Sequence, residues 1–220
     1  MSKIVHPIDT TESVCPVCLQ KIPATRVQKG KNVYLHKECP LHGVFETIIW
    51  RGDPAFESWR VEKVHSHPKN PFTEIRTGCP YDCGPCEEHL QNPCCVLLEV
   101  TQRCDLKCPV CFADSNLSPT SDPSLEEIKG WYARLLETQT SLNIQLSGGE
   151  PCVRDDLPAI IALGKQAGFP YFQLNTNGLR LAKEISFLKD LKNAGLSSVF
   201  LQFDGVTDQV YKTIDRKSVV

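Results

Sequence analysis

The sequence predicts an α/β fold, a partial barrel of alternating strands and helices, preceded by a small cysteine-rich module. The first observation is that residues 95–220 alternate short apolar runs of strand length with segments of helical periodicity. Repeated βα units of this kind form parallel sheets with right-handed crossovers. The second observation is that most of the twelve cysteines gather in short clusters before this region or near its start. The chain therefore divides into a metal-binding part and an α/β part.

Three segments follow from the local composition. Residues 1–66 form a small cysteine module with strand-like runs at Asn32–Leu35 and Val44–Trp50. Residues 67–94 are rich in proline, glycine and cysteine, which indicates an irregular connector held together by metal. Residues 95–220 carry the α/β pattern.

The elements of the α/β region can be placed in chain order. A capping box from Ser124 to Glu127 begins the first helix, and apolar residues recur behind it at helical spacing. Acidic residues at Asp155 begin a second helix, and a third is expected at Ala182–Ala194 with Gly195 as its C-terminal cap. The four strands are expected at Cys95–Thr101, Asn143–Ser147, Tyr171–Thr176 and Ser198–Phe203.

Alternate positions give these strands one apolar and one polar face. Because the core of a closed barrel is apolar, a polar face at the carboxyl ends indicates an open, curved barrel around a polar ligand. The alternative is a sheet whose polar face meets solvent; we favour the lumen because parallel sheets are usually covered on both faces. The apolar positions are Leu98, Val100, Ile144, Leu146, Phe172, Leu174, Val199, Leu201 and Phe203, and the polar ones are Glu99, Thr101, Gln145, Ser147, Gln173, Asn175, Gln202 and Asp204.

Composition excludes several classes of function. The net charge of −2, with both signs mixed, gives no electrostatic case for binding nucleic acid or an anionic membrane. No secretory signal follows the first residues, and no apolar run approaches the roughly 18 residues of a membrane span. Cysteines spaced two and three residues apart suit metals better than disulfides, so we expect a reducing compartment, the cytoplasm.

The first candidate site is formed by Cys104, Cys108 and Cys111, at C-x3-C-x2-C spacing directly after the first strand. Three thiolates hold three irons of a [4Fe–4S] cluster and leave the fourth iron open to another ligand. The alternative is a structural zinc site with a fourth ligand from elsewhere. A second motif, Ser147-Gly148-Gly149-Glu150-Pro151, follows about one βαβ unit later. Together, in this order, the two motifs resemble the radical SAM superfamily.

That resemblance implies a catalytic [4Fe–4S] cluster on the three cysteines, with S-adenosylmethionine bound at its open iron. The segment Ser147–Pro151 would cradle the methionine part, with Gly148 and Gly149 allowing the backbone to approach the ligand and Glu150 meeting the amino group. Backbone around Phe112 would read the adenine, although Val110 stands where members often have an aromatic residue. Gln202 and Asp204 are candidates for the ribose, and Asn175 and Asn177 could line the same pocket. Cys152 is expected to be a buried thiol rather than a ligand.

The second candidate site repeats the spacing at Cys79, Cys83 and Cys86. With Cys94 as the preferred fourth ligand, and Cys95 or His89 as alternatives, it would saturate an auxiliary [4Fe–4S] cluster for electron transfer or substrate binding. The alternative is a structural zinc site with four cysteine ligands.

The third candidate site joins Cys15 and Cys18 to Cys39 and His42, two knuckles about twenty residues apart. This pattern fits a zinc ribbon or a rubredoxin-like site with one iron, and thiolates suit either metal. His36 and His6 could compete with His42.

The three-site layout resembles one radical SAM subgroup, which includes the archaeal tetraether lipid synthases and proteins similar to 7,8-dihydro-6-hydroxymethylpterin methyltransferase. It implies reductive cleavage of S-adenosylmethionine to a 5′-deoxyadenosyl radical, which abstracts hydrogen from an unactivated carbon. An electron donor such as ferredoxin or flavodoxin is implied as a partner. We expect lipid-tail C–C coupling first, and methylation or modification of a pterin or another small molecule second.

A third hypothesis is a non-catalytic metal-binding fragment. The superfamily core resembles a partial barrel of six strands, whereas the βα pattern here stops after the fourth. We therefore expect a barrel that is incomplete at its C-terminal end.

Overall fold

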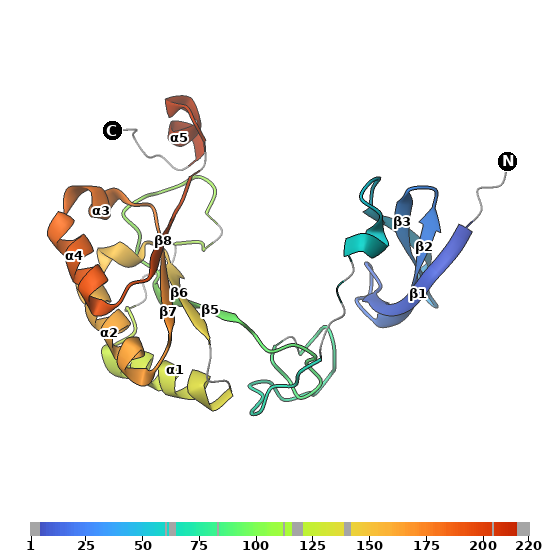
Figure 1. Ribbon diagram of the computed structural model, residues 1–220, viewed down its shortest axis with the longest axis horizontal. Coiled ribbons are helices and arrows are strands. Elements are labelled where there is room, and N and C mark those ends of the chain that lie inside the picture. The colour runs from blue at the N-terminus through green and yellow to red at the C-terminus, as the bar shows by residue number, and fades with distance from the viewer. Residues whose placement is uncertain are drawn as a thin grey trace. The chain divides into compact units, whose positions relative to one another are not determined.

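The computed structural model describes residues 5–59, 61, 65–82, 84–111, 113–115, 121–138, 142–203 and 205–214 (Figure 1). The chain forms two compact units, residues 1–91 and residues 92–220.

The first unit contains a four-stranded antiparallel sheet in the order β1-β2-β3-β4. Strand-like runs were expected within the last two of these strands, but β1 and β2 were not predicted. β1 is rich in threonine and polar residues and includes Pro7, which is tolerated because this strand lies at the sheet edge, where its register shifts between Pro7 and Asp9. The strands are β1 (Val5–Val14), β2 (Lys21–Lys29), β3 (Asn32–Cys39) and β4 (Gly43–Trp50), and a short 3-10 helix, η1 (Phe56–Trp59), follows them.

The core beside this sheet is small and contains cysteine. Cys15, Ile22 and Cys39 are buried together, with Phe45 packed against them. So few apolar groups bury little surface, and small domains of this kind depend on a metal or a disulfide for stability. The described residues between 65 and 91 form neither helix nor strand.

The second unit has a four-stranded parallel sheet in the order β5-β6-β7-β8. Its strands are β5 (Cys95–Thr101), β6 (Asn143–Gly148), β7 (Tyr171–Thr176) and β8 (Ser198–Leu201). Its helices are α1 (Leu125–Thr138), η2 (Pro151–Val153), α2 (Leu157–Ala167), α3 (Leu179–Lys183), α4 (Ile185–Ala194) and α5 (Asp208–Ile214). This is the predicted partial α/β barrel.

Local sequence explains most of these boundaries, with two corrections. The capping box forms as expected, because the Ser124 amide donates to the Glu127 carboxylate and the Glu127 amide to the Ser124 hydroxyl. The single helix expected at Ala182–Ala194 is wrong, since non-helical backbone at Glu184 separates α3 from α4. The fourth strand ends at Leu201 instead of Phe203.

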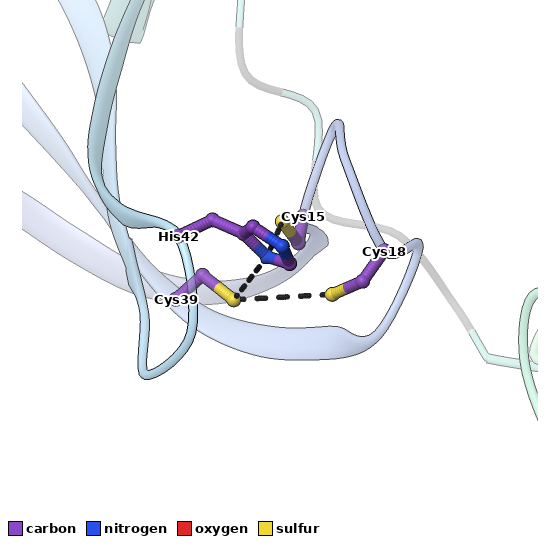
Figure 2. A group of neighbouring side chains, drawn as sticks. All are labelled: Cys15, Cys18, Cys39 and His42. Atoms are coloured by element: carbon purple, nitrogen blue, oxygen red, sulfur yellow. Dashed lines mark hydrogen bonds between the residues drawn. The ribbon is translucent and has the colours of Figure 1, made fainter.

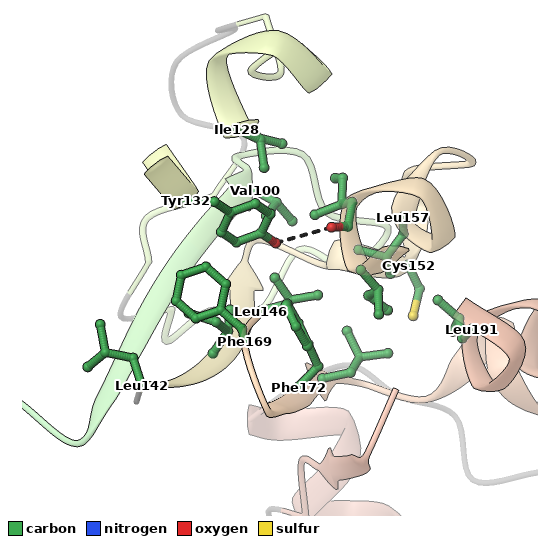
Figure 3. Close-up of a cluster of buried hydrophobic side chains, with 14 of the residues drawn as sticks. Val100, Ile128, Tyr132, Leu142, Leu146, Cys152, Leu157, Phe169, Phe172 and Leu191 are labelled. Atoms are coloured by element: carbon green, nitrogen blue, oxygen red, sulfur yellow. Dashed lines mark hydrogen bonds between the residues drawn. The ribbon is translucent and has the colours of Figure 1, made fainter. Parts of the chain in front are cut away.

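The apolar face of the sheet packs under α1, α2 and α4 (Figures 1 and 3). The side chains of Ile144, Leu146, Phe172 and Leu174 are fully buried there. Tyr132 of α1 packs against this layer, and its hydroxyl donates a 3.2 Å hydrogen bond to the backbone oxygen of Ile160 in α2. This layer fixes β5, β6 and β7 as a rigid base for the loops at their carboxyl ends.

β8 departs from the expected pattern. Val199 and Leu201 were expected to join the buried apolar face, but both side chains are exposed, as is Phe203 beyond the strand. Among the described residues, β8 pairs with β7 only and forms the edge of the sheet.

Candidate functional site

The loop with Cys104, Cys108 and Cys111 leaves the carboxyl end of β5 and runs beside the end of β6. Cys104 and Cys108 are partly buried and Cys111 is exposed. Two hydrogen bonds of 2.8 Å bind the loop's entry to the next strand, from the Gly149 amide to the Thr101 oxygen and from the Glu150 amide to the Arg103 oxygen. The backbone of the second motif therefore contacts the segment that leads into the cysteine loop.

The two glycines of the second motif serve this contact. Gly148 has φ +132°, and a Cβ there would lie 2.1 Å from the backbone oxygen of Thr101. A Cβ on Gly149 would lie 2.2 Å from the backbone oxygen of Arg103. We expected these glycines to let the backbone approach a ligand. The structure also gives them a close approach to the segment that leads into the cysteine loop.

Glu150 is buried and its carboxylate is used inside the protein. One carboxylate oxygen accepts hydrogen bonds from the Cys152 amide at 2.9 Å and the Thr176 hydroxyl at 2.7 Å. The other accepts from the Asn177 amide at 2.7 Å. The carboxylate thus joins the ends of β6 and β7, whereas the sequence suggested only a contact with a ligand.

Sequence reasoning missed a second group of residues that fixes the same loop. The Arg154 guanidinium is buried and donates 2.8 Å hydrogen bonds to the backbone oxygens of Val100 and Pro123. Asp122 accepts hydrogen bonds from the Thr101 hydroxyl and the Arg103 guanidinium. Nothing in the sequence marked these residues, because a single charged side chain in a loop is usually solvated.

A cavity of about 210 Å³ opens at the carboxyl ends of β6 and β7. It brings together most of the second motif and three further predicted residues, and it adds Thr176 and Phe200. The place of Phe200 on the polar side of β8 follows from the alternation of that strand. Phe112 and Asp204 lie outside the described residues, and Pro151 is buried at the start of η2. The lining residues are Ser147, Gly148, Gly149, Glu150, Asn175, Thr176, Asn177, Phe200 and Gln202.

Beneath the cavity, the polar face of the sheet carries a row of amides. The Gln145 amide nitrogen donates to the Gln173 side-chain oxygen at 2.7 Å and to the Asn175 side-chain oxygen at 2.9 Å. Gln173 continues the row by donating to the Ser198 hydroxyl at 3.3 Å. The face opposite the apolar core thus presents donors and acceptors in sequence along the sheet.

The environment changes the acidity of the loop thiols. Burial raises the pKa of the Cys104 thiol, and the neighbouring Asp105 carboxylate adds to the effect. At Cys111 burial acts in the same direction, but hydrogen bonds from the backbone and side chain of Ser115 outweigh it and lower the pKa. Burial raises the pKa of Cys152 to about 12, which fits the expected buried thiol.

The residues fit the groups that the motifs imply. Three thiolates on one short loop match three-point ligation of a [4Fe–4S] cluster. The adjoining cavity is lined by backbone, amide and carboxylate groups, which match the polar parts of S-adenosylmethionine. This fit depends on the three cysteine sulfurs as ligands for the cluster and on the cavity beside the loop.

The third candidate site is a compact group of side chains (Figure 2). The ligand atoms of Cys15, Cys18, Cys39 and His42 all lie within 4.8 Å of one another. His42 Nδ1 is 3.4 Å from Cys39 Sγ and 3.6 Å from Cys15 Sγ. Three sulfurs and one imidazole nitrogen fit a tetrahedral zinc or iron.

The histidines considered as competitors are not in this group. His36 faces Glu46 across β3 and β4, at 3.8 Å, and His6 lies on β1. Burial alone would raise the pKa of the Cys15 thiol, but hydrogen bonds from the backbone at Cys18 and Val17 outweigh it and lower the pKa to about 6. A thiol of this acidity is readily deprotonated for metal binding.

The second candidate site is described only in part. Cys79 is exposed and Cys86 buried, while Cys83 lies outside the described residues. The Asp82 carboxylate accepts from the backbone amides of Arg76, Thr77 and Gly78, which shapes the turn at Cys79. His89 is exposed in the same unit, whereas Cys94 and Cys95 belong to the second unit.

Comparison with known proteins gives two family matches. Residues 7–51 match the family described as the HMPTM N-terminal zinc ribbon domain. Residues 98–219 match the radical SAM superfamily. Within the part of the chain that the structure describes, no helix is both long and apolar enough to cross a membrane.

Individual relatives match this chain over part of their own length. It is 40% identical over 96% of its length to the 7,8-dihydro-6-hydroxymethylpterin dimethyltransferase of Methanocaldococcus jannaschii, which it covers to 42%. It is 32% identical over 60% of its length to the GTP 3′,8-cyclase of Syntrophomonas wolfei, covered to 40%. It is 34% identical over 51% of its length to the Fe-coproporphyrin III synthase of Methanosarcina barkeri, covered to 28%. The chain thus spans less than half the length of these relatives.

Proposed function

Because the chain belongs to the radical SAM superfamily, we propose that it uses S-adenosylmethionine to methylate or otherwise modify a pterin or a similar polar heterocycle. When bound at Cys104, Cys108 and Cys111, a [4Fe–4S] cluster with S-adenosylmethionine supplies a 5′-deoxyadenosyl radical for hydrogen abstraction from unactivated carbon. The other roles below belong to the chain's own residues.

The observation that carries the choice of substrate is the amide row of Gln145, Gln173 and Asn175 on the polar face of the sheet. Amide side chains offer both donors and acceptors, which suits a heterocycle with ring nitrogens, an amide and an amino group. A lipid tail would offer no partner to the donors and acceptors that these amides do not use on one another, and unpaired polar groups are unfavourable beside hydrocarbon. The name of the M. jannaschii relative, a pterin dimethyltransferase, supports the same choice.

Lipid-tail coupling, which the sequence led us to expect first, becomes the second hypothesis. It needs a long apolar groove, and the cavity at the strand ends has a volume of only about 210 Å³. The experiment below includes an isoprenoid lipid as a substrate, so one of its outcomes would support lipid-tail coupling.

The chain's residues would divide the work in the following way. Ser147, Gly148 and Gly149 would hold the methionine part along the end of β6, where Glu150 keeps the segment in place from beneath. Asn175, Asn177 and Gln202 would contact the ribose side, together with Asp204. The backbone around Phe112 would meet the adenine.

The remaining metal sites and partners complete the proposal. A second [4Fe–4S] cluster on Cys79, Cys83 and Cys86 would pass electrons or hold an intermediate. The ribbon would hold zinc or a single iron on Cys15, Cys18, Cys39 and His42. A ferredoxin or flavodoxin in the cytoplasm would supply electrons. The domains would run from 1 to 66, 67 to 94 and 95 to 220.

The test uses the whole chain, reconstituted anaerobically with iron and sulfide and reduced with dithionite. It is given S-adenosylmethionine with a deuterated methyl group, together with 7,8-dihydro-6-hydroxymethylpterin, an isoprenoid lipid or no substrate. We expect 5′-deoxyadenosine to rise with the pterin and a pterin product to gain mass. A rise with the lipid alone would replace the proposal by lipid coupling. A rise with neither substrate would count against both.

As a variant control, Gln145→Leu removes the donor of the amide row at nearly constant volume. We expect it to weaken the dependence of 5′-deoxyadenosine on the pterin while the slow background formation without substrate persists. An unchanged pterin dependence would remove the main support for a polar substrate.

A further inference from the structure

The side chain of Asn177 joins the end of β7 to the cysteine loop. Its amide nitrogen donates a 2.7 Å hydrogen bond to the Asp105 carboxylate, which stands between Cys104 and Cys108 in the chain. Its amide oxygen accepts from the Leu179 backbone at 2.9 Å. The two partners are separated by 72 residues of sequence, so this contact exists only in the folded unit.

Asn177 is itself held firmly. The residue is 8% exposed, and its backbone amide donates to the buried carboxylate of Glu150 at 2.7 Å. Glu150 is fixed in turn by the Cys152 amide and the Thr176 hydroxyl. A continuous series of hydrogen bonds therefore runs from the end of β6 through Glu150 and Asn177 to Asp105.

The carboxylate of Asp105 lies beside the sulfur of Cys104, one of the three cysteines expected to bind the cluster. One of its carboxylate oxygens, the same one that accepts from Asn177, lies 4.0 Å from Cys104 Sγ. A hydrogen bond from an amide to a carboxylate both orients the carboxylate and stabilises its charge. Cluster potentials depend on nearby charge and hydrogen bonding, so the orientation of this carboxylate is a means of tuning the site.

We propose that Asn177 is a positioning residue that acts through Asp105 to fix the Cys104–Cys108 segment and the charge beside the Cys104 sulfur. This rests on the proposed function, because it takes Cys104, Cys108 and Cys111 as the cluster ligands. Asp105 is exposed, and the side chain of Asn177 holds it from the end of β7.

The first readout needs no metal. Hydrogen exchange is followed at the backbone amides of residues 104–108 in the chain as purified. In Asn177→Leu we expect exchange at least about tenfold faster than in the wild type, the effect of losing one hydrogen bond to a charged group. The control is Asn193→Leu, at an exposed position of α4, where exchange of the loop stays unchanged. Unchanged exchange in Asn177→Leu overturns the inference.

The second readout is the midpoint potential of the reconstituted cluster, measured by an anaerobic titration followed by electron paramagnetic resonance. Asn177→Asp adds a negative charge facing Asp105 and is expected to lower the potential. In the double variant Asn177→Asp with Asp105→Asn, the amide and the carboxylate exchange places, and the potential is expected to return toward the wild type. Asn193→Asp adds the same charge on α4 and should leave the potential unchanged.

The outcomes separate the two claims. A wild-type chain that binds no cluster contradicts the proposed function, while the exchange result still decides whether Asn177 positions the loop. A cluster whose potential is the same in Asn177→Asp as in the wild type, or no return toward the wild type in the double variant, overturns the inference and leaves the proposed function standing.

Discussion

The hydroxyl of Thr176 donates a 2.7 Å hydrogen bond to the carboxylate of Glu150, in the buried layer between the ends of β6 and β7. The carboxylate also accepts from the Cys152 and Asn177 amides. Glu150, the acidic residue of the second motif, therefore has a structural role. Its carboxylate holds the ends of β6 and β7 together beside the cavity.

Replacing Glu150 should accordingly lower stability as well as ligand binding. In Glu150→Ala the three donors lose their acceptor inside the protein, and each unsatisfied buried group costs about 1–3 kcal/mol. We expect the free energy of unfolding of the second unit, measured by urea denaturation, to fall by about 2–5 kcal/mol. Glu126→Ala, on the exposed side of α1, should change it by less than about 0.5 kcal/mol. Equal stability of the two variants would contradict this role.

The close contact at Gly149 gives a second prediction. A methyl group in Gly149→Ala would meet the backbone oxygen of Arg103, which cannot move without moving the cysteine loop. Overpacking of this kind destabilises by about 1–3 kcal/mol. Gly130→Ala is the matched control, because its Cβ meets nothing within 4 Å and alanine favours a helix interior by about 1 kcal/mol. The midpoint temperature of thermal unfolding should therefore fall in Gly149→Ala and rise in Gly130→Ala.

The lowered pKa of Asp122 predicts how the stability of the second unit depends on pH. Burial alone would raise the pKa of this carboxyl, but hydrogen bonds from Arg103 and Thr101 outweigh it and lower the pKa below the ordinary value of 3.8. A lowered folded-state pKa contributes stability that is complete above the unfolded pKa and is lost as the pH falls through the folded pKa.

Asp122→Asn should therefore destabilise the protein more at pH 7 than at pH 3. Urea denaturation across this range measures the difference, and the two stability curves are expected to converge on the acid side. Asp190→Asn, at an exposed position of α4, should give a curve parallel to the wild type. A constant difference between Asp122→Asn and the wild type at all pH values would refute the assignment.

Metal removal should unfold the zinc ribbon (residues 7–51, with strands β1–β4) and leave the second unit folded. Because Cys15 and Cys39 form much of the core beside β1–β4, metal binding and folding are expected to be coupled there. Cys39→Ser, or a chelator, should abolish metal binding at this site and speed hydrogen exchange in β2 and β3 while β6 and β7 keep their protection. Cys152→Ala serves as control and should retain the ribbon metal. Protection of β2 and β3 in the metal-free protein would contradict the coupling.

Sequence patterns predicted the bounds of strands in the second unit closely where only one face of the strand is buried. β5 and β7 have the expected bounds because apolar and polar residues alternate along them. The pattern failed at Glu184, where the apolar spacing continues through a break that only the backbone reveals. It also failed at β1, whose polar residues pair through the backbone with β2 and need no apolar face.

The candidate site was predictable to the extent that it depends on residue type and spacing. The four ligand atoms of the ribbon lie together as their spacing suggested, and Asn175, Asn177 and Gln202 line the cavity with the second motif. The contacts of Arg154 and Asp122, and the separate contact of Asp105 with Asn177, could not be predicted, because they depend on which loops meet in three dimensions. The inner role of Glu150 was hidden for the same reason.

The most direct test of the central claim is 5′-deoxyadenosine formation by the whole chain, reconstituted anaerobically and supplied with dithionite and S-adenosylmethionine. The account predicts 5′-deoxyadenosine with the wild type and none with Cys108→Ala. Its absence from the wild type, with the iron and sulfide of a cluster bound, or zinc in place of iron at the loop cysteines, would contradict the account.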